Sequence, residues 1–478
     1  MAEFIDIVAR LRARERGYAI PIVSQRQQVI QPHALILTML AMAGEDTSVH
    51  AIAVGRVGEP AEINVAADPR DRDAQYALLR WLLPRIEAYY AWCRNALTFP
   101  QIWVSSAGAL GHLDTLGDRL RFTDEPDMQR LGLLLSYGGG RSFVAGQQAL
   151  ITATQALRNH FATGQQESED EHLGALLTWI EPPVGRDIFA SVEMAELLPM
   201  GFKTDPRFDA DDLFPAVQDY NAARNIGDPR QVEHRRARVQ QLLEGVIRPI
   251  HAGTQRAIGL LTDPRWQVNP ALDLLSQQES EAFASYMISR DEGYRVGYRD
   301  SPKAAAYRIV ARERAVANVE AGALRHDTAA REWGVAGGNV VRASLTAFNK
   351  VRIAPRQFRH AVELVSHQDN LHLRHGDVLW TLDGPKIGVL VDTATVLGPF
   401  TAITGALVKG MQSIGSIAIG TTLDFGPKAP DWNLVGDYAQ MSVRLANTPW
   451  THDTLMPPAA PVSSARPNDL LAVVEALA

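Results

Sequence analysis

Residues 50–67 read HAIAVGRVGEPAEINVAA, and this stretch decides the fold of the first part of the chain. Two apolar runs, residues 50–57 and residues 61–67, flank the short sequence GEP at positions 58–60. Short runs of this kind on either side of a Gly/Pro turn are typical of a β-hairpin. The pattern therefore predicts two neighbouring strands joined by a tight turn.

The segment that follows the hairpin changes to helical periodicity. Residues 71–92 carry apolar side chains at helical spacing, and Asp71 is placed to cap the helix. Residues 101–105 (QIWVS) predict the next strand, and residues 107–120 predict a short helix with Ser106 as its N-cap. A hairpin, a helix, a strand and a further helix in this order predict an α/β layer.

The length of 478 residues predicts two or three domains. We expect α/β plus all-β organisation, with an N-terminal α/β domain, a central helical region and a small C-terminal β-barrel or sandwich. The expected boundaries are 1–183 for the α/β domain, 184–230 for a connecting segment, 231–350 for the helical domain, 351–447 for the β-rich domain and 448–478 for an extended tail.

Helical and strand periodicities separate the last two folded regions. Apolar frameworks with charges of alternating sign predict long helices at 234–259, 271–290 and 302–324. β-branched runs interrupted by glycine predict strands at 358–366, 378–381, 387–392 and 414–423. The change of period near residue 350 is the basis for the boundary between the helical and the β-rich domain.

Composition and charge restrict the class of protein. The start of the chain lacks the apolar core of a secretory signal, and the most apolar window, residues 33–43, has the length of a buried core helix rather than a membrane span. We therefore expect a cytoplasmic protein without a membrane segment. Cys93 is the only cysteine, which excludes a Cys-based metal site and an internal disulfide, and its aromatic neighbours predict a core position. The net charge of -7 gives no global attraction to nucleic acid.

Complete catalytic motifs are missing from the sequence. It contains neither a P-loop nor a Gly-x-Ser-x-Gly elbow. The glycine run 138–140 is interpreted as a bend in preference to a phosphate-binding loop, and the His- and Asp-rich segment 367–377 as a solvated turn in preference to a metal site. Residues 328–342 match helix-turn-helix spacing, although Gly337 and Gly338 weaken the start of a recognition helix. We predict no metal and no cofactor outside the nuclease alternative described next.

The order of elements in residues 45–180, together with the acidic stretch at 167–171, resembles RNase H-like nuclease domains found beside RecB-type helicases. That resemblance implies carboxylates that gather two magnesium ions for phosphodiester cleavage. The candidate carboxylates are Asp68, Glu87, Glu167 and Asp170. Since the predicted strands HAIAVGRV and QIWVS carry no acid, we expect a degenerate copy that does not cleave.

A basic segment follows the predicted helical region. Its cations are interleaved with Phe348 and Phe358, a mixture that suits phosphate contacts and base stacking. The candidate nucleic-acid-binding residues are Arg342, Lys350, Arg352, Arg356 and Arg359.

Three functional hypotheses follow from these patterns. The favoured one is a non-catalytic accessory subunit that associates with DNA and with a helicase- or nuclease-like protein partner in bacterial repair or phage defence. The second is a scaffold protein that binds only protein partners, for which Trp450 in the tail is the candidate anchor. The third is a metal-dependent nuclease or hydrolase whose dispersed carboxylates bind Mg²⁺.

Overall fold

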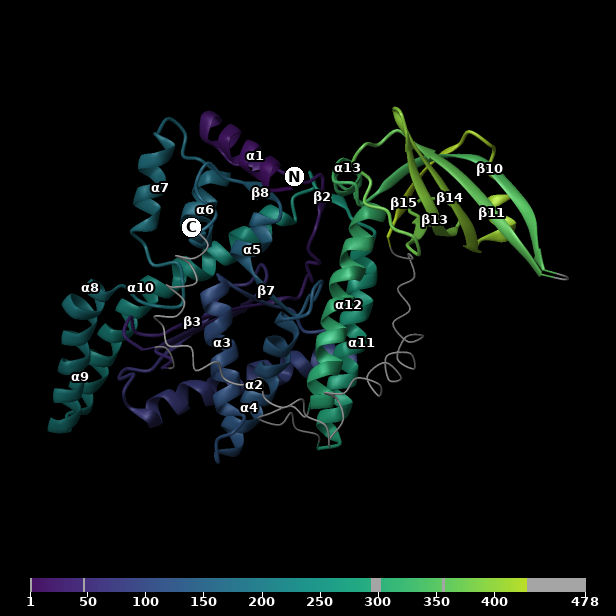
Figure 1. Cartoon of the computed structure of the whole chain (residues 1–478). Coiled ribbons are helices and arrows are strands. Elements are labelled where there is room, and N and C mark those ends of the chain that lie inside the picture. Colours follow the sequence, from purple (N-terminus) through teal and green to yellow (C-terminus); the bar gives the residue numbers. More distant parts are fainter. Residues whose placement is uncertain (1, 46–47, 294–301, 355–356, 428–478) are drawn as a thin grey trace, which may run out of the picture.

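The computed structural model describes residues 2–45, 48–293, 302–354 and 357–427 and comprises an α/β body and a β-barrel (Figure 1). The centre of the body is a five-stranded sheet in the order β5-β4-β3-β6-β7. Its strands are β3 (Leu35–Leu40), β4 (Ala51–Arg56), β5 (Glu62–Val65), β6 (Ile102–Val104) and β7 (Leu150–Thr152). β4 is antiparallel to both β3 and β5, whereas β6 is parallel to β3 and to β7.

The predicted hairpin is confirmed, since β4 and β5 pair in antiparallel register from Ala51 opposite Val65 to Val54 opposite Glu62. The prediction for residues 33–43 is wrong, because this window forms the central strand β3 and not a helix. All six residues of β3 are buried, since helices cover both faces of the sheet. A strand buried on both faces has a continuous apolar run, which periodicity cannot distinguish from a buried helix.

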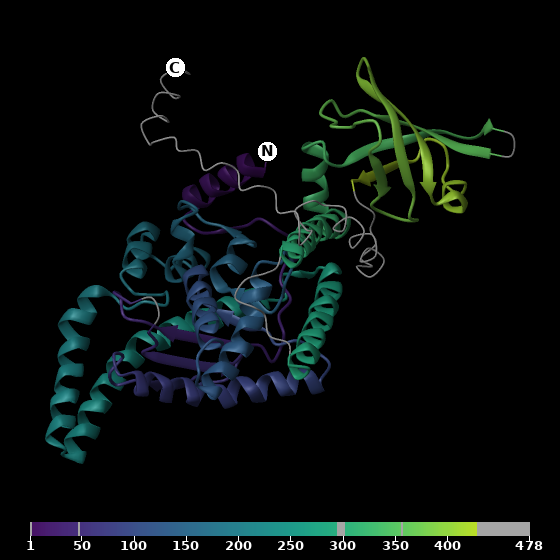
Figure 2. The same ribbon diagram turned by 60° about the horizontal axis from the view of Figure 1, so that its bottom comes forward.

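The sheet lies between two helical layers (Figure 2). Side chains at alternate positions of β3 face opposite layers. Leu37 and Met39 pack in the cluster that contains α2 (Arg72–Asn95), whereas Ile36 and Leu40 pack in the cluster that contains α10 (Pro229–Leu261). The layer with α2 also contains α3 (Ala107–Leu120), α4 (Pro126–Ser142) and α11 (Ala271–Asp291).

Two helix caps predicted in this layer are confirmed, whereas the bend predicted at a glycine run is not found. Asp71 accepts backbone hydrogen bonds at the start of α2, and Ser106 does so at the start of α3. The glycine run 138–140 forms no bend and lies inside α4. Gly139 lets the carboxylate of Asp114 on α3 approach closely, because a Cβ at position 139 would lie 1.9 Å from it and the side chain of Asp114 would have to move. Cys93 is fully buried, as predicted.

Residues 184–230 do not form an irregular connection, because three helices occupy much of this segment. These are α7 (Ile188–Glu196), α8 (Pro206–Phe208) and α9 (Phe214–Ile226). The three long helices predicted after them are found as α10, α11 and α12 (Pro302–His326). They do not form a separate domain: α10 packs directly on the sheet, and Phe283 and Met287 of α11 enter the core beside α2.

Shorter elements complete the body. They are α1 (Ala2–Arg16), β1 (Ile20–Pro21), β2 (Gln25–Arg26), α5 (Ala153–Arg158), β8 (Phe161–Ala162), η1 (Glu169–Glu171), α6 (Leu173–Ile180), η2 (Asp209–Leu213) and β9 (Gln267–Val268). β1 pairs with β8, and β2 pairs with β9, so that the N-terminal segment is tied to residues far along the chain.

The C-terminal β-rich region is a closed six-stranded barrel, which confirms the predicted barrel alternative. Its strands are β10 (Val341–Ala354), β11 (Gln357–Ser366), β12 (Val378–Thr381), β13 (Gly388–Leu397), β14 (Phe400–Lys409) and β15 (Thr422–Gly426), and a single turn, α14 (Met411–Ile414), precedes β15. The barrel starts at Val341, ten residues before the predicted boundary, and has its own apolar core.

The segment with helix-turn-helix spacing forms one helix followed by a strand. α13 (Thr328–Ala336) ends at Gly337, and β10 begins at Val341, so the position of a recognition helix is occupied by a barrel strand. Gly338 makes this turn with a φ of 75°, where a Cβ would lie 2.0 Å from the carbonyl oxygen of Asn370. Gly338 therefore allows the chain to turn from α13 into β10.

Within the described ranges, none of the helices is both long enough and apolar enough to cross a membrane.

Candidate nucleic-acid interface

The hairpin of β10 and β11 extends beyond the barrel wall (Figures 1 and 2). Near its base it is flanked on both sides, because β15 pairs with residues 341–344 and β14 pairs with residues 361–366. Residues 347–360, by contrast, pair only within the hairpin among the described strands. The two outer edges of this part therefore have no neighbouring strand among the described residues.

The register of the hairpin places most of its aromatic and basic side chains on one face. Lys350 is opposite His360, and Arg352 is opposite Phe358. Directly opposed residues project from the same face, and side chains alternate along each strand. The resulting set, which we call the inner face, consists of Phe348, Lys350, Arg352, Phe358 and His360.

The inner face continues the interior of the barrel. Phe348 is opposite Val362, which is 1% exposed and belongs to the barrel core. Leu345 on the same strand also points into that core, and the β-bulge between Leu345 and Ala347 brings Phe348 onto the same face. The apolar lining of the barrel thus passes, along one face, into aromatic and cationic side chains.

Two stacked pairs organise the inner face. The ammonium group of Lys350 lies 4.2 Å from the centre of the Phe358 ring, and this ring is 50% exposed. The rings of Phe348 and His360 are stacked, with their centres 5.7 Å apart and their planes 16° apart. Such side chains offer flat apolar surfaces and positive charge at adjacent positions.

Two of the predicted basic residues are engaged elsewhere. Arg342 lies at the base of the barrel, where its guanidinium pairs with Asp424 at 2.8 Å and with Glu332 at 2.7 Å. Arg359 pairs with Asp392 and lies opposite Val351, on the other face of the hairpin. The structure therefore does not gather the predicted set on one surface: only Lys350 and Arg352 share the inner face.

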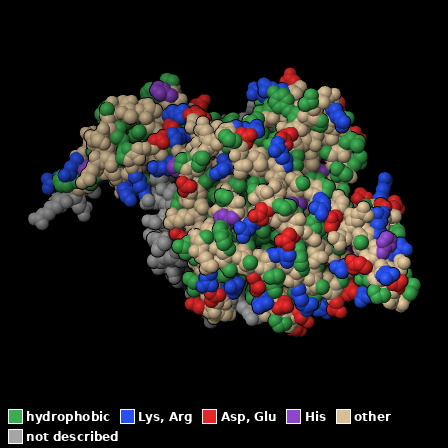
Figure 3. All heavy atoms as spheres, turned by 180° about the vertical axis from the view of Figure 1, so that it is seen from behind, with side chains coloured by type: hydrophobic (Ala, Val, Ile, Leu, Met, Phe, Trp, Pro, Cys, Tyr) green, Lys and Arg blue, Asp and Glu red, His purple; other side chains and the backbone are tan. Residues whose placement is uncertain are grey.

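Two other predicted residues, Arg356 and Trp450, lie outside the described residues. Figure 3 shows the molecule from behind, with its charged side chains coloured. Acidic and basic side chains are interspersed over the body, whereas Lys and Arg side chains lie at the far end of the barrel lobe.

The four candidate carboxylates have separate surroundings. Asp68 accepts a hydrogen bond from Asn221 at 2.7 Å, Glu87 lies 3.6 Å from Arg130, and Glu167 pairs with Arg158. Asp170 is fully buried and is held by Arg10 and by Thr163, each at 2.6 Å. Among the described residues, no three His, Cys, Asp or Glu side chains are arranged to hold a metal ion.

α/β proteins commonly bind ligands at the carboxyl ends of the parallel strands. Here residues 200–209 lie against the chain directly after β3. Lys203 pairs with Ala41 directly after β3, and Asp209 accepts a hydrogen bond from the backbone of Ala43 at 2.9 Å. Phe202 stacks on His112 with a distance of 4.9 Å between ring centres. This segment of the chain therefore covers the carboxyl end of β3.

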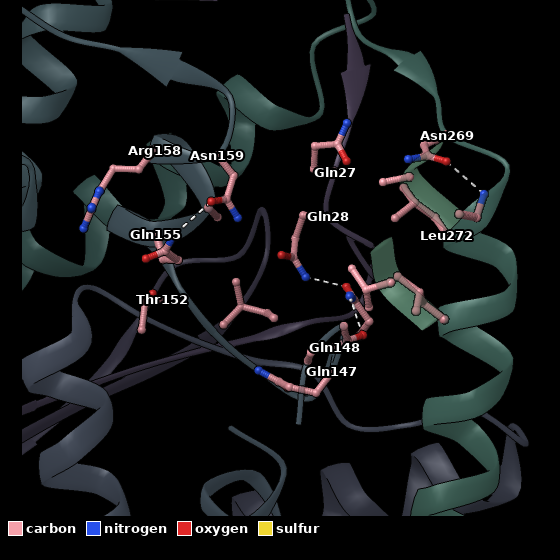
Figure 4. A pocket seen from close by; sticks show the side chains of 18 of the residues that line it. Gln27, Gln28, Gln147, Gln148, Thr152, Gln155, Arg158, Asn159, Asn269 and Leu272 are labelled. Carbon is pink, nitrogen blue, oxygen red and sulfur yellow. Dashed lines mark hydrogen bonds between the residues drawn. The ribbon is translucent and has the colours of Figure 1, made fainter. Parts of the chain in front are cut away.

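A cleft of about 710 Å³ lies between β7 and α5 on one side and α11 to α13 on the other (Figure 4). Its polar lining consists mainly of side-chain amides, which come from Gln27, Gln28, Gln147, Gln148, Gln155, Asn159 and Asn269. In Figure 4, Gln28 and Gln148 point toward one another, as do Gln155 and Asn159. Arg158 and Asp327 also line the cleft, so that one cation and one anion accompany the amides.

Much of the hydrogen-bonding capacity of these amides is used inside the protein. Gln147 accepts from the backbone N–H groups of Ala149 and Leu150 at 2.8 and 3.0 Å. Gln27 donates to Asp327 at 3.0 Å, and Arg158 in the same wall pairs with Glu167 and Glu171. The amides therefore hold the walls of the cleft in place and leave few polar groups free for a ligand.

Sequence reasoning missed the amide-lined cleft, although the dipeptides Gln27-Gln28 and Gln147-Gln148 are visible signals. Polar pairs are common in surface turns, so only the fold shows that these two pairs meet.

No family model matches this chain, and neither the curated proteins nor the solved structures contain a significant match. The residues and their geometry are therefore the basis for assigning a function.

Proposed function

We propose that this protein is a non-catalytic accessory subunit that holds a single strand of nucleic acid on the inner face of the β10–β11 hairpin. Its protein partner would be a bacterial helicase or nuclease. The observation that carries the proposal is the register of the hairpin, which brings Lys350 and Arg352 onto the same face as Phe348, Phe358 and His360.

Single-strand binding combines cations that follow the backbone with aromatic side chains on which bases stack. The inner face has both, and it projects from the barrel where a strand can reach it. Neither Lys350 nor Arg352 forms an ion pair with a described carboxylate, so their charges are available to phosphates. A local site of this kind is compatible with the overall charge of -7, because screening confines the influence of distant acids.

The order of the elements and the composition of the sheet support a role without catalysis. The hairpin, helix, strand and helix that resemble an RNase H-like domain are β4, β5, α2, β6 and α3. β3, β4 and β6 carry no acidic residue, whereas two-metal cleavage needs several carboxylates at one point. These features support a degenerate relative of such nucleases that contributes binding and not cleavage.

The test is fluorescence anisotropy of labelled single-stranded DNA with the full chain across a salt series. The double variant Lys350→Glu/Arg352→Glu should bind at least tenfold more weakly at low salt. It should also lower the slope of log K against log salt by about 1.4, since each phosphate contact to a single strand contributes roughly 0.7. Incubation with Mg²⁺ should leave the DNA intact.

The matched control is Asn349→Glu/Val351→Glu, which adds the same number of acids to the opposite face of the same strand. This control should lose less than threefold in affinity, and both double variants should unfold at the same urea concentration as the unmodified protein. Equal weakening by the two double variants, or no binding by the unmodified protein, would overturn the proposal.

A further inference from the structure

A second cavity, of about 540 Å³, lies between the helix pair α3 and α4 and the helix pair α11 and α12. It shares no residue with the inner face of the hairpin, and its lining differs from that of the amide-lined cleft because it is rich in arginine. The arginines are Arg121, Arg141, Arg290, Arg308 and Arg312. Two carboxylates, those of Asp114 and Asp118, share this lining.

Two of the arginines are held in fixed positions by carboxylates. Arg141 forms two hydrogen bonds with Glu279, at 2.8 and 3.0 Å, and the same carboxylate accepts from Tyr137 at 2.7 Å. Glu279 is 1% exposed, so this group is an internal support of the cavity wall. Arg121 pairs with Asp118 at 2.9 Å. A wall built in this way is organised before any ligand arrives.

Other donors of the cavity have little or no internal acceptor. Nε of Arg121 is buried and has no hydrogen-bond partner. Arg312 forms no ion pair with a described carboxylate, and Arg290 reaches Asp291 only at 3.5 Å. Asp291 is already held by Arg94 at 2.7 Å. A buried donor without an acceptor is costly, and Nε of Arg121 is such a donor. The exposed guanidinium of Arg312 lines the same cavity, so an anion with several oxygen atoms can bind both groups.

Flat side chains lie beside these donors. Phe143 is 58% exposed, and the guanidinium of Arg312 lies 5.0 Å from the centre of its ring. The rings of Tyr137 and Tyr286 lie 4.9 Å apart on another wall. The carboxylate of Asp114 rests against Gly139 and forms no hydrogen bond with a described residue, so it can accept from a hydroxyl or amino group. The cavity thus offers sites for an anion, a ring and a polar substituent.

We infer that this cavity binds a phosphomonoester joined to a flat ring, the chemistry of a nucleoside monophosphate or of the 5′-phosphorylated end of a strand. Arginine forks hold the phosphate, because their paired N–H groups match its oxygen atoms. The exposed ring of Phe143 receives the base. This site is independent of the hairpin and goes beyond the proposed single-strand binding.

Gly140 permits a sharp test of the cavity. It lines the cavity, and a Cβ added there would meet no atom within 4 Å. The Cβ of Gly140→Leu therefore contacts no atom of the fold, the remaining leucine atoms take up space in the cavity, and the change replaces a residue that weakens helices. The matched control is Gly245→Leu, on α10, where a Cβ also meets open space outside this cavity. Neither variant should lower the unfolding midpoint.

The measurement is isothermal titration calorimetry with adenosine 5′-monophosphate, adenosine and inorganic phosphate. The full chain carries Lys350→Glu/Arg352→Glu, so that binding at the hairpin does not contribute. The monophosphate should bind at least tenfold more tightly than either fragment. Gly140→Leu and Arg312→Ala should each weaken the binding of the monophosphate at least tenfold. Gly245→Leu should bind the monophosphate as tightly as the parent chain.

A pair of trinucleotides with and without a 5′-phosphate separates the two sources of this chemistry. Binding of the free monophosphate supports a free nucleotide as the ligand, and binding confined to the 5′-phosphorylated trinucleotide supports a strand end. Equal binding of phosphorylated and unphosphorylated probes, or unchanged binding by Gly140→Leu, would overturn the inference.

Discussion

The α/β body and the β10–β11 hairpin treat their charged groups in opposite ways. In the body, Asp170 and Glu279 are buried and each is held by an arginine and by neutral donors. On the inner face of the hairpin, Lys350 and Arg352 pair with no described carboxylate and lie beside aromatic rings. A charge that is paired inside the fold needs its partner, because removal of one member leaves the other buried and unpaired. Unpaired charge on a projecting element is available to a ligand.

A fall in pH should lower the stability of the body far more than that of the barrel. Burial lowers the pKa values of His50, His160 and His251 to about 4, and all three lie in the body. Since the unfolded chain binds protons near pH 6.5, the stability of the body is complete above that pH and falls as pH drops toward 4. Each histidine contributes up to roughly 1.4 kcal/mol per pH unit in this window.

Urea unfolding at pH 7 and at pH 4.5 measures the loss of stability of the whole chain. Hydrogen exchange of body and barrel peptides at the same two pH values shows how that loss is divided between them. No histidine among the described barrel residues is buried, so barrel peptides should keep their protection longer as pH falls. His251→Asn should flatten the pH profile of the body, and the same change at the exposed His234 should not. Parallel loss of body and barrel protection would contradict this account.

Removal of a buried acid should have the next largest effect. Glu279→Ala deprives Arg141, the hydroxyl of Tyr137 and the backbone of Gln148 of their shared acceptor. Breaking such a buried pair costs about 3–5 kcal/mol, because the remaining charge has no partner. Urea denaturation followed by tryptophan fluorescence measures the loss.

The control for Glu279 is Glu244→Ala, which removes the half-buried partner of the exposed Arg248 on α10. A surface pair four residues apart on one helix contributes only about 0.3–0.5 kcal/mol. A loss at Glu279 no larger than the loss at Glu244 would show that the buried pair does not stabilise the body.

Sequence patterns predicted the elements with local signals and missed those defined by distant contacts. The β4–β5 hairpin, the cap at Asp71 and the long helices follow from periodicity and capping, which are local. β3 was mistaken for a helix, because its continuous apolar run depends on helices that cover both faces of the sheet. Its burial is set by α10, almost two hundred residues away in the sequence.

The candidate site was predictable in composition but not in geometry. The mixture of cations and aromatic residues from 342 to 360 is visible in the sequence, but its division between two faces is not. That division depends on the bulge after Leu345 and on the partners of Arg342 and Arg359, which come from other elements. The arginine-lined cavity has no signal in the sequence, because four helices contribute to it.

The smallest expected effect concerns Arg342, which the sequence grouped with the binding residues. Its guanidinium joins α13 to the barrel through Glu332 and Asp424, and both ion pairs are partly exposed. Arg342→Ala should therefore lower barrel stability by only about 1 kcal/mol. It should also leave the affinity for single-stranded DNA within twofold, in contrast to the double variant of Lys350 and Arg352. A tenfold loss of affinity on Arg342→Ala, measured by the same anisotropy assay, would mean that the binding surface extends to the base of the barrel and that pairing with a carboxylate does not withdraw an arginine from phosphate contact.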